Sequence, residues 1–132
     1  MAEPLQLTPA RADPEALGAA ALQAFFSITA RWALGAEDER ILLGNPPRST
    51  FFKWKKERAA RLGNDVLERI SYVMGIYKAL HILLPDARAA DSWPTRPNAA
   101  PLFGGRSAIE KMRGGRVVDL ADVRRYLDAE RG

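Results

Sequence analysis

A cluster of cationic side chains in the middle of the chain has the composition needed to contact a polyanion. Residues 48–61 hold six Lys and Arg side chains against one acidic residue, Glu57. A local excess of this kind favours a nucleic acid as partner, although a basic surface that only keeps the protein in solution is the alternative. On a helix, Arg48, Phe52 and Lys56 share one face, because they are four residues apart. The residues expected to contact DNA are Arg48, Ser49, Thr50, Phe52, Lys53, Lys55 and Lys56.

These side-chain types fit distinct roles in a major groove. Arg48 is suited to a two-pronged bond with a guanine edge, and Phe52 to contact with a thymine methyl group. Ser49 can reach a base or a phosphate, whereas the lysines are suited to phosphates, which set position and affinity rather than sequence. Residues 37–39 are acidic, so we expect them to face away from the DNA.

Catalytic chemistry has little support in this sequence. The chain contains one histidine, His81, and no cysteine, so it lacks thiol nucleophiles, disulfides and Cys-ligated zinc. His81 falls on an apolar stripe, where a buried structural role is the common one. Gly104, Gly105, Arg106 and Ser107 lack the spacing of a phosphate-binding loop. We therefore expect no enzyme, metal or cofactor, and the absence of cysteine suits a cytoplasmic protein.

The elements that position the cationic cluster are predicted to be helices, and the fold class is all-α. Apolar spacing of three and four predicts helices over 13–33, 36–43, 47–60 and 65–84. Gly44, Asn45, Pro46 and Pro47 predict a tight turn, so the second and third helices form a helix-turn-helix. Gly35 is expected to end the first helix. Residues 86–101, with three prolines, are expected to be a loop.

The last third is predicted to be a small helical unit. A short helix is expected to start at Arg106 and Ser107 and to stop at Gly114, with a strand-like step at residues 117–118. Asp119 is expected to cap a final helix over 119–132.

The fourth predicted helix is apolar on several sides, which is typical of a central core helix or of a core helix that is also a dimer face. Its main stripe comprises Val66, Ile70, Val73, Tyr77 and Leu80.

Domain boundaries are expected near residues 12 and 85. Residues 1–12 read as a flexible arm without signal-peptide character, and no apolar run reaches the length of a membrane span. Residues 13–85 would form the helix-turn-helix domain, and residues 86–132 the C-terminal domain.

Two separated parts of the chain resemble one known family, the Xre/MbcA/ParS antitoxins. Residues 35–58 resemble the Xre-like helix-turn-helix in Leu42, Leu43, Gly44, Arg48, Ser49, Thr50, Trp54 and Lys55. Residues 93–132 resemble the toxin-binding domain in Trp93, Pro97, Asn98, Leu102, Phe103, Gly104, Gly105, Arg106, Ser107, Met112, Gly114, Gly115, Val123, Tyr126, Leu127, Arg131 and Gly132. The chain departs from the family at Ala108, where Pro is frequent, and at Pro47, where a Ser or Thr cap is frequent.

The resemblance implies a type II antitoxin that binds a RES-domain toxin, an enzyme that consumes NAD or transfers its ADP-ribose. It also implies that the C-terminal region covers the NAD pocket of the toxin, and that the antitoxin binds operator double-stranded DNA to repress its own operon. A homodimer within the toxin–antitoxin complex is expected on other grounds, because a single unit with so few cations would bind DNA weakly. The residues expected to contact the toxin are Arg106, Arg116, Arg124, Tyr126, Asp128, Glu130, Arg131 and Gly132.

The alternative is a stand-alone helix-turn-helix transcriptional regulator without a toxin partner. It explains residues 35–58 equally well, but it does not account for the final helix of mixed charge. Co-purification with a second small protein would separate the two.

Overall fold

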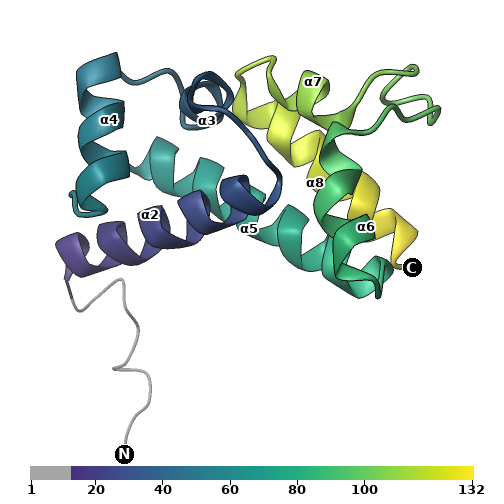
Figure 1. Ribbon diagram of the computed structural model, residues 1–132, viewed down its shortest axis with the longest axis horizontal. Coiled ribbons are helices and arrows are strands. Elements are labelled where there is room, and N and C mark those ends of the chain that lie inside the picture. The colour runs from purple at the N-terminus through teal and green to yellow at the C-terminus, as the bar shows by residue number, and fades with distance from the viewer. Residues whose placement is uncertain (1–12) are drawn as a thin grey trace, which may run out of the picture.

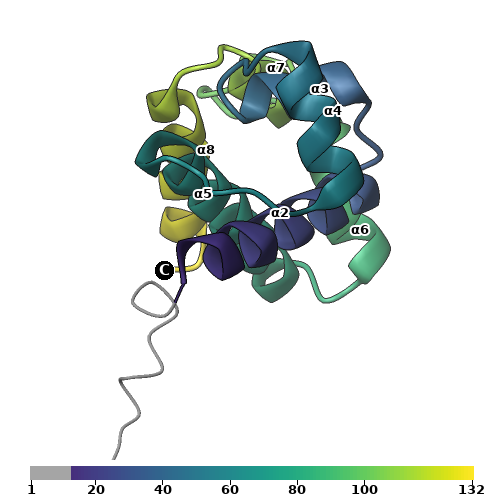
Figure 2. The same cartoon turned by 90° about the vertical axis from the view of Figure 1, so that its left-hand side faces the viewer.

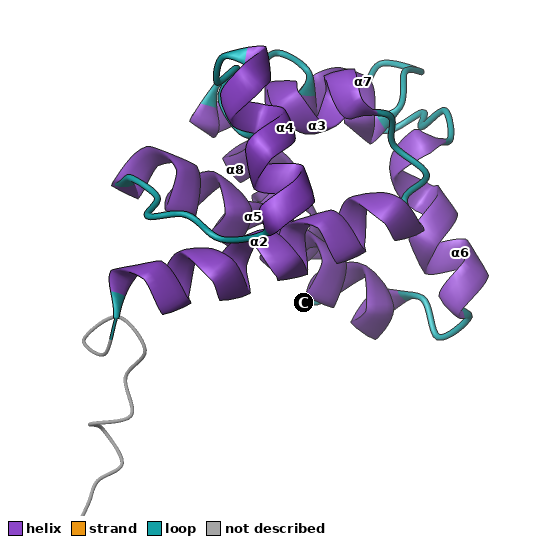
Figure 3. Ribbon diagram, turned by 60° about the vertical axis from the view of Figure 1, so that its left-hand side comes forward, coloured by secondary structure: helices purple, strands orange, loops and turns teal. Residues whose placement is uncertain are grey.

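The computed structural model describes residues 13–132, which fold into seven α-helices and one short 3-10 helix without a strand (Figures 1 and 3). The all-α prediction is therefore confirmed, whereas the predicted arm of residues 1–12 lies outside the described residues. In chain order the elements are α2 (Pro14–Arg31), α3 (Ala36–Leu42), α4 (Arg48–Glu57), α5 (Asn64–Leu83), α6 (Ala87–Ser92), the 3-10 helix η2 (Trp93–Thr95), α7 (Ala108–Met112) and α8 (Val117–Glu130).

Helix α2 begins as its sequence predicts and ends earlier. The Asp13 side chain accepts a hydrogen bond from the Glu15 N–H at 3.0 Å, and Pro14 occupies the first turn. The helix ends because Ala33 adopts a left-handed conformation, with φ of 59°. The expectation that Gly35 stops this helix was wrong, since Gly35 is the N-cap residue of α3.

The helix-turn-helix consists of α3, the turn at residues 43–47, and α4. The turn uses two left-handed residues, Gly44 with φ of 96° and Asn45 with φ of 58°. Pro47 precedes α4 as its N-cap residue, and left-handed Arg58 follows its end. Helix α4 is thus shorter than the predicted 47–60.

Helix α5 lies at the centre of the molecule and packs against both α2 and α8 (Figures 1 and 2). Its side chains Ile70, Val73 and Leu80 are buried within the protomer, while Val66 and Tyr77 are half-buried. The helix-turn-helix and the C-terminal unit therefore share one core helix.

The C-terminal unit differs from its prediction in two places. Residues 86–101 are not a plain loop, because Asp86 caps α6 by accepting the Arg88 N–H at 3.2 Å. Helix α8 begins at Val117, so the strand-like step does not exist, and Asp119 reaches back to the Arg116 N–H from the first turn instead of capping the helix. The predicted start of α7 is confirmed, since Ser107 and Glu110 form a capping box.

Candidate nucleic-acid and protein interfaces

Helix α4 stands at one end of the molecule, far from the C-terminus at the opposite end (Figure 1). Its buried side is anchored by Phe51, whose ring packs edge-on against Phe26. Phe52 is 51% exposed although it is a large apolar residue. The exposed face of α4 comprises Arg48, Ser49, Phe52, Lys53 and Lys56, and Thr50 is half-buried beside it. This face brings five of the seven predicted DNA-contacting residues together.

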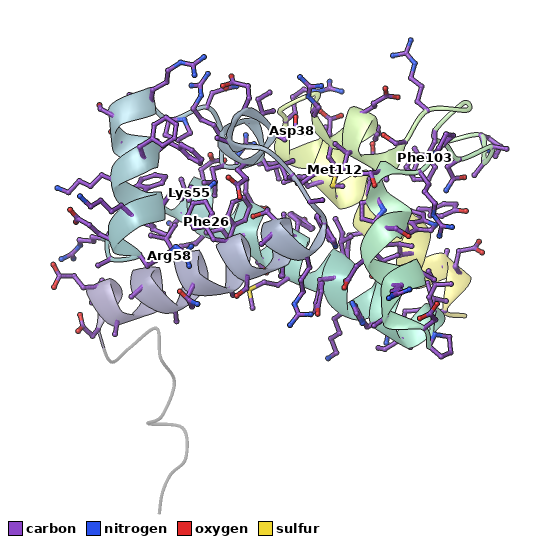
Figure 4. All side chains as sticks on the ribbon, in the orientation of Figure 1. Phe26, Asp38, Lys55, Arg58, Phe103 and Met112 are labelled. Carbon is purple, nitrogen blue, oxygen red and sulfur yellow. The ribbon has the colours of Figure 1, made fainter. Side chains whose placement is uncertain are left out.

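Lys55 is placed differently from the other lysines of α4. Its ammonium lies 2.6 Å from the carboxylate of Glu39 and 5.8 Å from the centre of the Phe26 ring (Figure 4). Glu39 is only 2% exposed and also accepts a hydrogen bond from the Thr29 hydroxyl at 2.6 Å. Lys55 thus ties α4 to α3 and α2, and its half-exposed ammonium is paired with a buried carboxylate.

The three acidic residues at the start of α3 point to different partners and do not form one face. Glu37 lies 3.1 Å from Arg48, so it does not face away from the basic surface as expected. Its pKa is lowered mainly by the hydrogen bond from Arg40, and Arg48 contributes to the same effect. Arg48 is therefore already paired with a carboxylate, at an exposed position.

Asp38, the remaining acidic residue of the segment, connects the two halves of the molecule. Its carboxylate lies 3.0 Å from the guanidinium of Arg113, at the end of α7. Close by, the Ile41 side chain lies beside Gly115. Sequence reasoning missed this link, and no local pattern signals a pair between residues so far apart in the chain.

The predicted toxin-contacting residues do not form one patch. Arg116 lies at the start of α8, and Glu130, Arg131 and Gly132 lie at its end. A helix of 14 residues separates these groups by about 21 Å. Arg106 belongs to neither group, since it is exposed in the loop before α7. Only the residues near the end of α8 lie close together.

The end of α8 carries a chain of ion pairs on its exposed side. Arg124 contacts Asp128 at 3.1 Å, and Arg131 contacts the same carboxylate at 3.7 Å. Glu130 and Gly132 are exposed beyond them. Such surface pairs add little stability, so these side chains can be redirected to a partner at small cost.

Tyr126 is held in an aromatic cluster. Its ring stacks on Trp93 with centroids 6.4 Å apart and meets Phe103 edge-on at 5.2 Å. The cluster joins α8 to η2 and to the loop that carries Leu102, which is itself exposed. Tyr126 therefore orders this loop, and its half-buried edge is what remains available to a partner.

Arg116 is engaged by a buried carboxylate at the start of α8. Asp119 is 2% exposed and accepts hydrogen bonds from the Arg116 guanidinium at 2.9 Å and from the Lys111 ammonium at 3.0 Å. These bonds, the one from Arg116 above all, lower the pKa of Asp119 to about 2, and Asp119 in turn raises the pKa values of Lys111 and Arg116. Asp119 joins α7 to α8 and was not expected as a structural centre.

The described residues contain no group of acidic, His or Cys side chains that could hold a metal ion. His81 pairs with Asp91 at 2.8 Å, which links α5 to α6, and its ring lies against that of Tyr77 at a tilt of 40°. Across residues 13–132, no helix has both the length and the apolar character needed to cross a membrane.

Comparison with known proteins identifies two family domains in the chain. Residues 9–75 match the model of the antitoxin Xre-like helix-turn-helix domain. Residues 79–132 match the model of the antitoxin Xre/MbcA/ParS C-terminal toxin-binding domain, so this match begins inside α5. The chain is also 52% identical to the uncharacterised protein y4oB of Sinorhizobium fredii (strain NBRC 101917 / NGR234) over 113 residues, which cover 86% of this chain and 85% of that protein.

Proposed function

This chain belongs to the Xre/MbcA/ParS family of antitoxins, and we propose that it neutralises a RES-domain toxin and represses its own operon. The family supplies the antitoxin role, the DNA-binding module and the toxin-binding module. The identity of the toxin, its reaction, the homodimer and the cytoplasmic location are parts of the proposal.

The observation that carries the proposal is the separation of two charged surfaces. The exposed face of α4 and the exposed end of α8 lie at opposite ends of the molecule (Figure 1). A DNA duplex on α4 therefore leaves the end of α8 free for a protein partner. A stand-alone regulator has no use for the second surface.

For DNA, the exposed face of α4 enters the major groove. Arg48 reads a base edge, Phe52 contacts a thymine methyl group, and Lys53 and Lys56 neutralise phosphates. Lys55 is left out of this surface, because its ammonium is already paired with Glu39. A single α4 offers few cations, so a dimer that reads two half-sites about one helical turn apart gives the needed affinity.

For the toxin, the end of α8 covers the pocket that receives NAD. Arg124 and Arg131 suit a pocket built for the pyrophosphate of NAD, and Asp128 and Glu130 can pair with cations that the pocket itself supplies. Tyr126 borders this surface with its half-buried edge, and Gly132 completes its tip. Arg106 and Arg116 lie apart from the end of α8, so in this proposal they contact the toxin at separate points.

The test is expression of the adjacent reading frame with and without this chain. If that frame encodes a RES-domain toxin, its product alone should lower cellular NAD and arrest growth, and co-expression of this chain should restore both. The two proteins should also co-purify. An adjacent frame of another kind, together with no protein captured from the native host, would favour the stand-alone regulator.

A further inference from the structure

A small pocket lies where α5 and α8 both end, at the end of the molecule opposite α4 (Figure 1). Its volume is about 190 Å³, and its walls consist of four leucines, two aromatic rings and one carboxylate. The lining residues are Leu80, Leu83, Leu84, Trp93, Tyr126, Leu127 and Glu130. This volume is below that of an ordinary cofactor site, so one long side chain fits the pocket better than a whole nucleotide does.

Two aromatic rings form part of the wall of this pocket. Trp93 and Tyr126 are half-buried, and the planes of their rings differ by 20°. Phe103 packs edge-on against both rings but does not line the pocket, so the pocket borders a side of the rings that Phe103 leaves uncovered. The π systems of Trp and Tyr attract cations, and a planar guanidinium also stacks on them.

The charges around the pocket favour a cation. Glu130 is exposed, and it takes part in none of the ion pairs among residues 13–132. Leu83 and Leu84 are the last residue and the C-cap of α5, so the negative end of the dipole of a 20-residue helix lies at the pocket. Pro85 follows and has no N–H to donate to the His81 carbonyl, which increases the negative character of this helix end.

The chain's own cations do not occupy this pocket, because no Lys or Arg lines it. Arg131 directly follows Glu130 in the sequence, yet its guanidinium lies 3.7 Å from the Asp128 carboxylate. Arg96 directly follows η2 and donates a hydrogen bond to the Ala89 carbonyl at 3.4 Å. The cation that the pocket attracts must therefore come from another molecule.

We propose that this pocket receives one arginine side chain of the protein partner that binds the end of α8. The guanidinium lies against Trp93 and Tyr126 and pairs with Glu130, while its aliphatic stem contacts the leucines. The inference rests on the proposed function, because the partner it names is the toxin. It adds a contact in the opposite direction, in which the toxin inserts a side chain into this chain.

A side chain of a protein partner fits this pocket better than other occupants do. Glu130 belongs both to the pocket and to the end of α8, so the pocket is continuous with the surface proposed for the toxin. A metal ion needs several oxygen or nitrogen ligands, whereas one carboxylate lines the pocket. Duplex DNA is an anion, so the carboxylate and the helix end repel it. The leucine walls contact the methylene groups of a long side chain, which a small free cation lacks.

The first test uses the full chain without a toxin. Acetyl-arginine amide is titrated into isotopically labelled protein and followed by NMR, and acetyl-citrulline amide, which has nearly the same shape but no charge, is the control ligand. The indole N–H signal of Trp93 should shift with the arginine compound, with a dissociation constant in the millimolar range, and stay in place with the citrulline compound. The indole signal of Trp32, which is 1% exposed and lies outside the pocket, should move with neither. Glu130→Gln should weaken the binding about threefold.

The second test is a double-mutant cycle on the complex of the full chain with the toxin. Glu130→Gln should raise the dissociation constant of the complex about tenfold, and alanine in place of one toxin arginine should do the same. The two changes together should cost little more than either alone, because both remove the same contact. Glu68→Gln is the matched control, since it neutralises an exposed acid on α5 outside the pocket, and it should leave the affinity unchanged.

Two results would overturn the inference: a Trp93 signal that responds to neither compound or equally to both, or a toxin in which no arginine couples to Glu130. Circular dichroism of each variant shows that it is folded. A chain that binds the arginine compound as expected but neutralises no toxin keeps the pocket and removes the proposed function. A chain that neutralises the toxin while Trp93 ignores the arginine compound keeps the proposed function and removes the pocket.

Discussion

Lys55 and Glu39 form an ion pair of 2.6 Å that joins α4 to α3 from the inner side of the helix-turn-helix. Glu39 is buried and receives the Thr29 hydroxyl as well, so three helices meet at one carboxylate. The orientation of the exposed face of α4 therefore depends on an ion pair that lies outside that face.

Replacement of Lys55 should cost stability. Lys55→Ala leaves the Glu39 carboxylate buried without its cation, so we expect the free energy of unfolding to fall by about 1–3 kcal/mol. Urea denaturation measures this. Lys53→Ala is the control, since Lys53 is exposed and should change stability by less than about 0.5 kcal/mol. Equal losses in the two variants would contradict the structural role of Lys55.

Removal of the exposed lysines should weaken DNA binding without changing its sequence preference. The variant Lys53→Ala with Lys56→Ala removes two phosphate contacts, so affinity for operator and for unrelated DNA should fall by a similar factor. The slope of log K against log salt should decrease by about 2. Fluorescence anisotropy over a range of salt concentrations gives both values. An unchanged operator affinity would mean that α4 is not the recognition helix.

Truncation should separate the two activities. A chain without residues 128–132 keeps the buried residues of α8 up to Leu127 but loses Asp128, Glu130 and Arg131. We expect it to bind operator DNA as the full chain does and to fail to protect cells from the toxin. Growth assays with the co-expressed toxin test this. Protection by the truncated chain would show that the end of α8 is not the toxin-binding element.

The fold was predictable where the signals are local, and two of the errors have separate causes. Asp13 and Pro14 correctly predicted the start of α2, and the prolines before α4 correctly predicted the turn. The prolines also led to the wrong prediction of a loop where α6 lies. Pro85 and Pro94 suggested this loop, and the Asp86 cap between them was overlooked. Paired valines at residues 117–118 suggested a strand, but the reach of Asp119 back to Arg116 makes them the first turn of α8.

The candidate sites were predictable only in part, since periodicity assigns faces but not tertiary partners. The spacing of Arg48, Phe52 and Lys56 placed them on one exposed face. It could not show that Lys55 points to Glu39, sixteen residues earlier, or that Asp38 pairs with Arg113. The residues expected to contact the toxin were chosen from a resemblance. The length of α8 separates them into groups at its two ends, and no sequence pattern shows this separation.

Stability should depend on pH through Asp119. Its pKa in the folded protein is about 2, below the ordinary value of 3.8, so its contribution is present above pH 4 and is lost as the pH falls towards 2. A shift of this size corresponds to about 2 kcal/mol. Asp119→Asn should therefore be less stable than wild type by about 2 kcal/mol at neutral pH, and the difference should shrink in acid. Denaturation curves at several pH values test this, and a gap that does not narrow would contradict it.

A single methyl group should disturb the contact between α2 and the segment after α4. A Cβ at Gly18 would lie 1.8 Å from the Ala60 carbonyl oxygen, which is backbone and cannot rotate away. Gly18→Ala should therefore lower the free energy of unfolding by about 1–3 kcal/mol. Gly63→Ala is the control, because no atom lies within 4 Å of its added Cβ. Thermal melts compare the two, and a Gly18 variant as stable as the control would argue against this close approach.

Because both halves of the molecule share α5, segments cannot be exchanged freely between related chains. The helix contributes buried residues to both the α2 side and the α8 side, and Asp38 and Arg113 fasten the halves a second time. A chimaera that joins residues before Pro85 to the C-terminal unit of a relative would combine side chains that do not pack together in this shared core. The C-terminal unit therefore cannot be exchanged at Pro85 without loss of stability. Recombinant chains should therefore keep a stable core only when the whole of α5 is exchanged together with the helices that pack against it.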